Sequence, residues 1–235
     1  AYEILIGLVG SEMCIRDRIK AQRIAEKGFA HMLDFIKVGR TEKEIQLELD
    51  YYMLKNGAEA LSFDTIALSG SNTSLPHGVP SDKKVESGEF VLMDFGATYD
   101  GWHSDMTRTV CVGKPSDKMK SVYETVLTAQ LSALDAVKAG MSGKALDKIA
   151  RDIITEAGYG DNFGHSLGHG VGVEIHESPY ASPSREDILP ENSIVTVEPG
   201  IYLEGKFGVR IEDFVVVTEN GCINMTKAPK ELICL

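Results

Sequence analysis

The sequence predicts an α+β protein made of two similar halves. Stretches with helical spacing of apolar residues occur in pairs, and each pair is followed by strand-like runs. The segment 36–45 (IKVGRTEKEI) also resembles the segment 137–146 (VKAGMSGKAL) at an offset of 101 residues. This repeated order indicates a duplication. No linker or low-complexity segment separates the halves, so we expect one domain over residues 19–235.

In the first half, two helices are expected on either side of Gly39. Thr41 and Glu44 have the spacing of a capping box and predict the start of the second helix. The apolar stripes of the two helices are Ala25, Phe29, Met32 or Leu33, and Ile36, and then Ile45, Leu49, and Tyr52 or Met53. Strand-like runs follow at 65–70, 90–99 and 106–112.

The second half repeats this order. Gly140 separates two further helices, and Ser142 is placed to cap the second of them. Their stripes are Val122, Val126, Ala129, Ala133 and Val137, and then Leu146, Ile149 or Ala150, Ile153 or Ile154, and Ala157. Strand-like runs return at 193–199 and 209–218.

The composition narrows the class of partner. The 235 residues include 24 basic and 35 acidic side chains, which gives a formal net charge of −11. Such an acidic chain is a poor ligand for nucleic acid or for an anionic membrane. Cysteine is scarce and has no CxxC spacing, which favours the reducing cytoplasm and argues against a structural zinc site. We therefore expect a cytoplasmic protein with neither nucleic acid nor membrane as a partner.

Residues 1–18, AYEILIGLVGSEMCIRDR, stand apart from this pattern. They read as the translation, in one frame, of a common sequencing-library adapter, and they show neither a helical stripe nor the features of a signal peptide. We expect them to be non-native and to pack on nothing specific. Because Ile19 then follows without an initiator Met, the natural protein is expected to begin upstream, with an N-terminal domain that precedes this segment.

Two aspartates are expected to meet in the first half. Asp100-Gly101 is a strong signal for a type I′ hairpin between two strand-like runs. This turn places Asp94 opposite Thr107 and makes Asp105 a diagonal neighbour of Asp94 on the same face. Two carboxylates so placed repel each other unless one is protonated or a cation lies between them. Asp94 also follows an apolar run, so a surface position fits it poorly.

Histidines gather in the segment FGHSLGHGVGVEIHESP (163–179). His165 and His169 are four residues apart, as in a helical zinc site, but Ser166 stands where that motif has Glu. Four glycines oppose a helix, so extended chain is expected. Three histidines within twelve residues, beside glycines, favour a functional site over separate structural roles.

Two glutamates are expected to meet in the second half. Glu198 and Glu212 each lie in an apolar strand-like run, and a turn centred on Gly205 would set them opposite each other. Pro199 cannot donate a hydrogen bond to a neighbouring strand, so a local irregularity is expected there. The apolar neighbours of Glu198 make a surface position a poor fit for it.

Four carboxylates and one imidazole that converge from both halves would form a dinuclear metal site. Ligation rich in oxygen favours Mn²⁺, with Co²⁺ and Zn²⁺ as alternatives. Two such ions can activate water at neutral pH and polarise a carbonyl. Two divalent ions are therefore the predicted cofactors.

At these motifs the chain resembles the pita-bread metallopeptidase family, which comprises methionine aminopeptidase, aminopeptidase P and prolidase. Five separated motifs occur in order over residues 19–235. The resemblance implies a pita-bread fold, in which the helices of two pseudo-symmetric halves pack on a curved antiparallel sheet. It also implies that Asp105 and Glu212 bridge the metals. The full ligand set that it implies is Asp94, Asp105, His169, Glu198 and Glu212.

The resemblance also implies roles around the metals. His77 and His176 would contact substrate and stabilise the tetrahedral intermediate, and Glu198 would carry the proton from the nucleophile to the leaving nitrogen. His165 and Arg210 match substrate-binding positions of the Xaa-Pro branch. In this branch the N-terminal domain commonly assists dimerisation, so a homodimer is expected for the full-length protein.

These features predict an exopeptidase that cleaves the Xaa-Pro bond at the N-terminal end of short peptides, as a dipeptidase or an aminopeptidase P. SDMTRTV (104–110), GVRIEDF (208–214) and the His165/His169 pair favour this branch over methionine aminopeptidase, the alternative within the family. The bond before proline has no N–H, so recognition must use the shape of the ring and flanking charges. A non-catalytic pita-bread binding protein is the alternative of another class, and retention of all five ligands argues against it.

Overall fold

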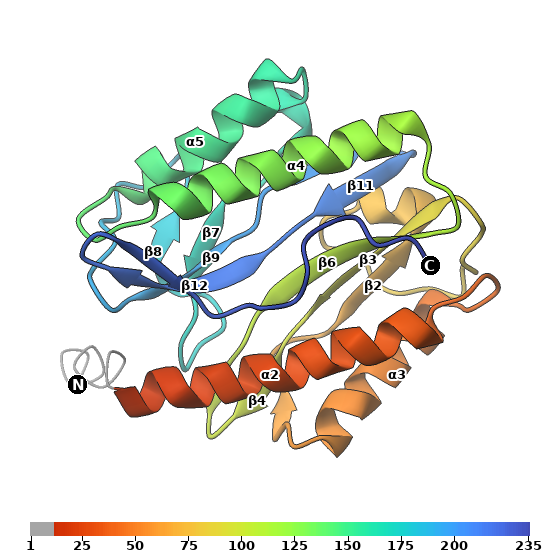
Figure 1. Ribbon diagram of the computed structural model, residues 1–235, viewed down its shortest axis with the longest axis horizontal. Helices are drawn as coiled ribbons and strands as arrows, with labels where there is room; N and C mark the ends of the chain where they lie inside the picture. The colour runs from red at the N-terminus through yellow and green to blue at the C-terminus, as the bar shows by residue number, and fades with distance from the viewer. Residues whose placement is uncertain (1–11) are drawn as a thin grey trace.

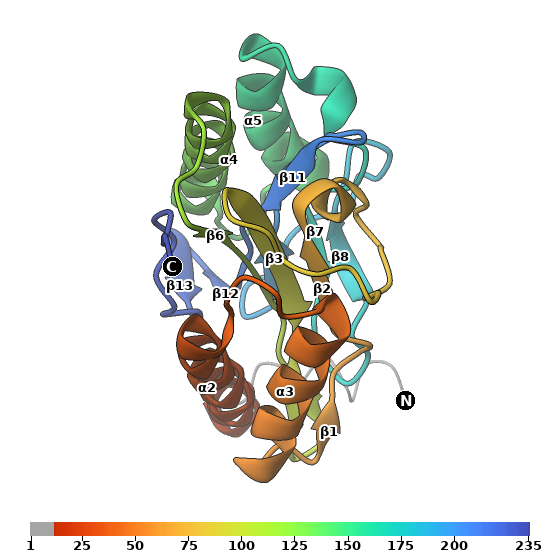
Figure 2. The same cartoon turned by 90° about the vertical axis from the view of Figure 1, so that its right-hand side faces the viewer.

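The computed structural model describes residues 12–235, and its elements follow the predicted order (Figures 1 and 2). The helices are α2 (Glu12–Phe35), α3 (Glu42–Lys55), α4 (Asp117–Ala136) and α5 (Gly143–Glu156). The first half also contains β1 (Ala60–Leu61), β2 (Ile66–Ser69), the 3-10 helix η1 (Gly70–Ser74), β3 (Glu89–Phe95), β4 (Ala97–Tyr99), β5 (Trp102–His103) and β6 (Met106–Val112). The second half contains η2 (Gly160–Asn162), β7 (Gly168–Gly170), β8 (Glu177–Ala181), β9 (Ile194–Val197), β10 (Gly200–Leu203), β11 (Phe207–Arg210), β12 (Asp213–Thr218) and β13 (Gly221–Asn224).

The strands lie between the two pairs of helices. In Figure 1, α4 and α5 cover one side of the strands, and α2 and α3 cover the opposite side. Each side has its own apolar core: Val126 and Leu146 pack with Val195 in one, and Phe29 and Leu49 pack with strand β3 in the other. All pairs of the named strands are antiparallel. No described helix has the length and apolar character needed to cross a bilayer.

The first long hairpin has the register that its turn predicts. Asp100 and Gly101 have φ angles of 50° and 73°, as a type I′ turn requires. Asp94 pairs with Thr107 between β3 and β6, which confirms the predicted pairing. The predicted strand 90–99 is divided in two, because the ladder is interrupted between β3 and β4.

The second long hairpin is built in the same way around Gly205, whose φ angle is 66°. β9 pairs with β12, and β10 pairs with β11, in one continuous register. This register sets Glu198 opposite Glu212 where the ladder is interrupted, next to Pro199, as predicted. The predicted strand 209–218 is therefore divided between β11 and β12.

The helix starts confirm the predicted caps. Thr41 Oγ1 accepts from the Glu44 N–H at 3.1 Å, and the Thr41 N–H donates to Glu44 Oε2 at 2.8 Å. Ser142 Oγ accepts from the Ala145 N–H at 3.2 Å. The glycine-rich segment after α5 is extended, and β7 forms in it beside β9. Strands β1, β5, β8 and β13 had no prediction from sequence.

Helix α2 extends into the segment that the sequence sets apart. It begins at Glu12, and Ile15 packs on a small core of Val171, Ile194, Phe214, Val216 and Met225. Arg18 is fully buried, with its guanidinium carbon 3.9 Å from the centroid of the Trp102 ring. The expectation that residues 1–18 pack on nothing specific is therefore wrong for Ile15 and Arg18, because helical periodicity carries the buried face of α2 into this segment. Residues 1–11 lie outside the described part of the chain, and the adapter origin of 1–18 remains a prediction that the nucleotide sequence tests.

Candidate metal centre

One cavity of about 330 Å³ is lined by all nine residues that the sequence singles out. The cavity lies where the two long hairpins meet. Its lining also includes Phe63, Ile66, Ser166, Gly168 and Tyr180. The nine predicted residues are His77, Asp94, Asp105, His165, His169, His176, Glu198, Arg210 and Glu212.

The two hairpins join where strand β6 of the first lies beside residues 210–212, at the junction of β11 and β12 of the second. The Glu212 N–H donates to the carbonyl of Thr107 at 3.1 Å, and Thr109 Oγ1 donates to the carbonyl of Arg210 at 3.0 Å. Thr107 Oγ1 also donates to Glu212 Oε2 at 2.7 Å, which orients that carboxylate. One carboxylate from each half is thereby brought to the same place.

Asp105, His169 and Glu212 form a close group. One ligand atom from each lies within 4.8 Å of the others, and all three residues are buried. His169 Nε2 lies 3.6 Å from Asp105 Oδ2 and 3.4 Å from Glu198 Oε1. His169 Nδ1 lies 3.0 Å from the carbonyl of Gly170, which can only accept, so Nδ1 carries the proton and Nε2 is available to a metal. This is a nitrogen and oxygen donor set suited to a divalent ion.

Asp94 is held by a different partner. Its Oδ2 accepts from Arg210 at 2.6 Å. Its other oxygen, Oδ1, is buried and has no hydrogen-bond partner among the described residues. A buried carboxylate oxygen without a donor is costly, and a cation in the cavity would satisfy it. The residues therefore fit a divalent metal both by their donor chemistry and by this unpaired oxygen.

Several buried carboxyl groups of the cavity have pKa values above their ordinary range. Burial, followed by the charges of neighbouring carboxylates, raises the pKa of Asp105 and of Glu212 well above the ordinary values. Burial also raises the pKa of Glu198 to about 8. Burial lowers the pKa of His169 to about 4, so its imidazole is neutral, the form that binds metals. A nearby divalent cation would reverse the shifts of the acids.

The predicted substrate-binding residues surround this group. The rings of His176 and His169 have their centroids 4.4 Å apart. His165 Nε2 lies 2.8 Å from the Tyr202 hydroxyl. Burial, followed by the charge of Arg210, lowers the pKa of His165 to about 3.

Tyr202 is a residue of this site that sequence reasoning missed. Its hydroxyl accepts from Arg210 at 2.7 Å and contacts His165, so it links the two predicted residues of the Xaa-Pro branch. Burial raises the pKa of Tyr202 to about 12. The signal that could have found it is strand alternation, since Tyr202 lies an even number of residues after Glu198.

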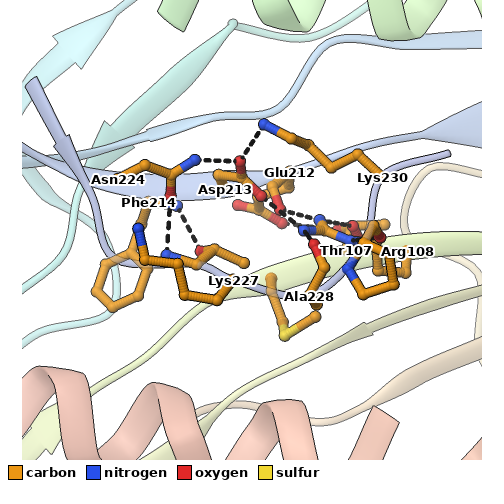
Figure 3. A network of polar contacts seen from close by, with 12 residues as sticks. Thr107, Arg108, Glu212, Asp213, Phe214, Asn224, Lys227, Ala228 and Lys230 are labelled. Carbon is orange, nitrogen blue, oxygen red and sulfur yellow. Dashed lines mark hydrogen bonds and ion pairs between the residues drawn. The ribbon is translucent and has the colours of Figure 1, made fainter. Parts of the chain in front are cut away.

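Behind Glu212, a buried arginine ties both hairpins to the C-terminal segment (Figure 3). The side chain of Arg108 is 1% exposed, and strand alternation directs it to the face opposite that of Thr107. Asp213, which pairs with Arg108 at 2.7 Å, also accepts from Asn224 and from Lys230. The N–H groups of Arg108 donate to Thr107 O, Glu212 O, Asp213 Oδ1, Ala228 O and Pro229 O. The backbone of Glu212 is thereby fixed from behind the cavity.

The chain is similar to known metallopeptidases. Residues 18–219 match the model of metallopeptidase family M24. The chain is 50% identical over 214 residues to the Xaa-Pro dipeptidase of Pyrococcus furiosus, covering 91% of this chain and 62% of that protein. It superposes, with TM-scores of 0.94 and 50% identity, on the Xaa-Pro dipeptidase from Bacillus anthracis and on the X-Pro aminopeptidase from Thermotoga maritima. These matches cover 96% of this chain, and 63% and 64% of those chains. The chain thus spans less than two thirds of the length of each of these proteins.

The chain belongs to metallopeptidase family M24. Its structural neighbours confirm the predicted pita-bread fold and the α+β class. The family and the group of Asp105, His169 and Glu212 together support the use of a divalent metal.

Proposed function

We propose that this chain carries the catalytic centre of an exopeptidase that cleaves the bond before proline at the N-terminal end of short peptides. The observation that carries the proposal is the convergence of all nine predicted residues on one cavity. Four carboxylates gathered in a cavity cost free energy unless a cation compensates them. All five ligands are retained beside His77 and His176, which favours the enzyme over a binding protein without catalysis.

Five residues would hold two divalent ions, with Mn²⁺ as the preferred ion and Co²⁺ or Zn²⁺ as alternatives. Asp105 and Glu212 would bridge the ions. Their placement supports this role, because each comes from a different hairpin and both belong to the close group with His169. When bound, such ions activate water and polarise the substrate carbonyl. The five ligands are Asp94, Asp105, His169, Glu198 and Glu212.

Proton transfer and stabilisation of the intermediate would be carried out by side chains of the protein. Glu198, whose Oε1 accepts from Thr196 Oγ1 at 3.1 Å, would carry the proton from the nucleophile to the leaving nitrogen. His77 and His176 would donate hydrogen bonds to the oxygen that becomes negative in the tetrahedral intermediate.

The lining of the cavity supports proline as the residue after the cleaved bond. The nitrogen of that bond has no hydrogen to donate, so binding must use the shape of the ring. Phe63, Ile66 and Tyr180 supply apolar or aromatic surface, and His165 and Arg210 lie in the same cavity. The Pyrococcus furiosus relative is named a dipeptidase and the Thermotoga maritima relative an aminopeptidase, so the length of the peptide stays open.

A direct comparison of substrates tests this function. Xaa-Pro dipeptides, Xaa-Pro-Yaa tripeptides and Met-Ala-Yaa peptides would be supplied to the protein with Mn²⁺ present. We expect release of Xaa from at least one proline peptide to be faster than release of Met. Faster release of Met from Met-Ala-Yaa would assign the chain to the methionine aminopeptidase alternative.

Removal of metal tests the centre separately. We expect exhaustive chelation to abolish the hydrolysis of Xaa-Pro peptides and Mn²⁺ to restore it. Metal analysis after dialysis should give up to two divalent ions per chain. Activity that survives chelation would overturn the metal-dependent mechanism.

We also propose a cytoplasmic location. Cys111, Cys222 and Cys234 are all free, which supports a reducing compartment. Detection of the protein in the cytoplasmic fraction of its native cells tests this. Recovery outside the cytoplasm would contradict it.

A further inference from the structure

The loop that carries His77 joins the two halves at the cavity. We define this His77 loop as residues 69–81, which run from the last residue of strand β2 through η1 to Ser81. Thr73 Oγ1 accepts from the Gly208 N–H at 2.7 Å, and the carbonyl of Pro76 accepts from Arg210 at 3.3 Å. His77 follows these contacts and lines the cavity. The position of His77 therefore depends on how the loop is held.

One carboxylate binds both ends of the His77 loop. Glu42, the first residue of α3, is 0% exposed. Its Oε1 accepts from the Ser69 N–H at 2.7 Å, and its Oε2 accepts from the Ser81 N–H at 3.0 Å. Asn72 Nδ2 lies 3.0 and 3.1 Å from the two oxygens. The hydroxyls of Ser69 and Ser81 also contact the carboxylate, at 3.2 and 2.6 Å.

The start of α3 reinforces this anchor. The first N–H groups of a helix have no partner within the helix. Here the Glu42 N–H donates to the carbonyl of Lys83 at 3.0 Å, and the Lys43 N–H donates to that of Ser81 at 3.1 Å. The helix start and the end of the loop therefore satisfy each other's hydrogen bonds. None of the described residues of α3 lines the cavity, so Glu42 acts on the site through the segments that it holds rather than by direct contact.

Freeing such a loop would have a large effect on the site. Residues released from one backbone conformation regain conformational entropy, so a freed loop would sample many positions. A displacement of about 1 Å at a reacting group can lower the rate by about 100-fold. Glu42 holds the chain five residues before His77, at Asn72, and four residues after it, at Ser81.

We propose that Glu42 is a positioning residue for His77, because its carboxylate fixes both ends of the loop that brings His77 to the substrate. This role rests on the proposed function, since the position of His77 matters to a rate only if the cavity is the peptidase site. Glu42 itself does not line the cavity.

Hydrogen exchange tests the anchor without reference to activity. In the 235-residue chain, Glu42→Gln replaces one acceptor oxygen by an NH₂ group that cannot accept a hydrogen bond. We expect the amide of Ser69 or of Ser81 to exchange faster by about tenfold or more. Glu48→Gln makes the same change on the same helix, at a contact of 2.7 Å with His31, and should leave both amides unchanged. Wild-type exchange rates in Glu42→Gln would overturn the proposal.

A double-mutant cycle tests the consequence for His77. We expect Glu42→Gln to lower kcat/KM for Xaa-Pro peptides by about 10- to 100-fold, with metal content unchanged. In a His77→Ala background the same substitution should lower kcat/KM by less than about twofold. Equal losses in both backgrounds would show that Glu42 acts elsewhere and would overturn the proposal. If the wild type cleaves no Xaa-Pro peptide, the proposed function fails, while hydrogen exchange still decides whether Glu42 anchors the loop.

Ser81→Ala provides a second route if Glu42→Gln does not fold. It removes the hydroxyl that donates to Glu42 Oε2 at 2.6 Å and keeps the N–H. The expected loss of kcat/KM is smaller, about threefold, and should vanish in the His77→Ala background. A loss that persists in that background would overturn the positioning role.

Discussion

The two halves hold their cavity loops with different sets of side chains. In the first half, the carboxylate of Glu42 accepts hydrogen bonds from N–H groups at both ends of the His77 loop. In the second half, α5 presents an ion pair, in which Asp147 Oδ1 accepts from the Leu167 N–H at 3.0 Å and Arg151 supplies donors. Arg151 donates to the carbonyls of Phe163 and His165, each at 2.8 Å. Both arrangements fix a segment that carries a histidine of the cavity, the first by accepting hydrogen bonds and the second by both accepting and donating them.

The difference teaches that the duplicated fold does not require duplicated polar contacts. At the offset of 101 residues, Glu42 corresponds to Gly143, which has no side chain to bind a loop. The second half uses Asp147 and Arg151 further along α5, paired at 2.7 Å. The apolar stripes determine where the helices pack, and these stripes occur in both halves. A polar anchor only has to match the donors or acceptors that its own loop leaves unpaired.

The largest expected effect comes from removing one bridging ligand from either half. Asp105→Asn and Glu212→Gln should each lower kcat/KM for Xaa-Pro peptides by about 100-fold or more, with fewer bound ions, because each removes a charge from the shared site. Asp152→Asn, at an exposed ion pair with Lys148 on α5, is the matched control and should retain activity. Substantial activity in either ligand variant would contradict the role of the replaced carboxylate as an essential bridging ligand.

The next largest effects should show that two buried arginines, one from each hairpin, have different roles. Arg108 pairs with Asp213 behind the site, and Arg210 pairs with Asp94 inside the cavity. Arg108→Met should lower the free energy of unfolding by about 3–5 kcal/mol, because it leaves carbonyls and part of a buried carboxylate without donors. Arg210→Met should lower kcat/KM even where the protein is fully folded, since it releases Asp94.

Urea denaturation and kinetic assays on the same samples of Arg108→Met and Arg210→Met test these two predictions. Arg40→Met, at a half-exposed pair with Glu44 of 3.7 Å, should change the free energy of unfolding by less than about 1 kcal/mol. Arg108→Met with wild-type stability, or Arg210→Met with wild-type kcat/KM, would contradict the division of roles.

The hairpin registers could be predicted from sequence because local signals determine them. The Asp100-Gly101 turn and the alternation of the strands fix the pairing of Asp94 with Thr107. The turn at Gly205 does the same for the second hairpin. The residues of the cavity follow from these registers together with the family resemblance.

The supporting residues could not be predicted, because their partners are distant in the sequence. Glu42 reads as an ordinary acidic residue in the first turn of a helix, and its partners lie 27 to 39 residues away. Arg108 lies in the strand-like run 106–112, and no local signal identifies its partner Asp213, which is 105 residues further on. Such contacts depend on which segments the tertiary fold brings together.

A moderate effect is expected for the anchor of the second half. Arg151→Met should lower the free energy of unfolding by about 1–3 kcal/mol, because two carbonyls lose their donor and Asp147 loses its charged partner, keeping only the Leu167 N–H. Its effect on kcat/KM should be smaller than that of Glu42→Gln, since the His165 side chain keeps its own contact with Tyr202 at 2.8 Å. Lys148→Met, at the exposed pair on the same helix, is the control. A larger kinetic loss in Arg151→Met than in Glu42→Gln would reverse the comparison.

The smallest expected effect compares the turns of the two hairpins. Gly101 and Gly205 have φ angles of 73° and 66°, and a Cβ added at either would meet nothing within 4 Å. Gly101→Ala and Gly205→Ala should therefore each lower the free energy of unfolding by about 1 kcal/mol, which is the strain of the left-handed conformation.

Gly221→Ala is the matched control, because an added Cβ there also meets nothing within 4 Å but its φ angle is not positive. It should change the free energy of unfolding by less than about 0.5 kcal/mol.

The two turns differ in what they touch: the Gly101 N–H donates to Glu59 of its own half at 3.1 Å, and the Gly205 N–H donates to Ser74 of the His77 loop at 3.3 Å. Because Ala keeps the N–H, kcat/KM should stay within about twofold of the wild type in both variants. A kinetic loss confined to Gly205→Ala would show that the second hairpin, as well as Glu42, determines where the His77 loop lies.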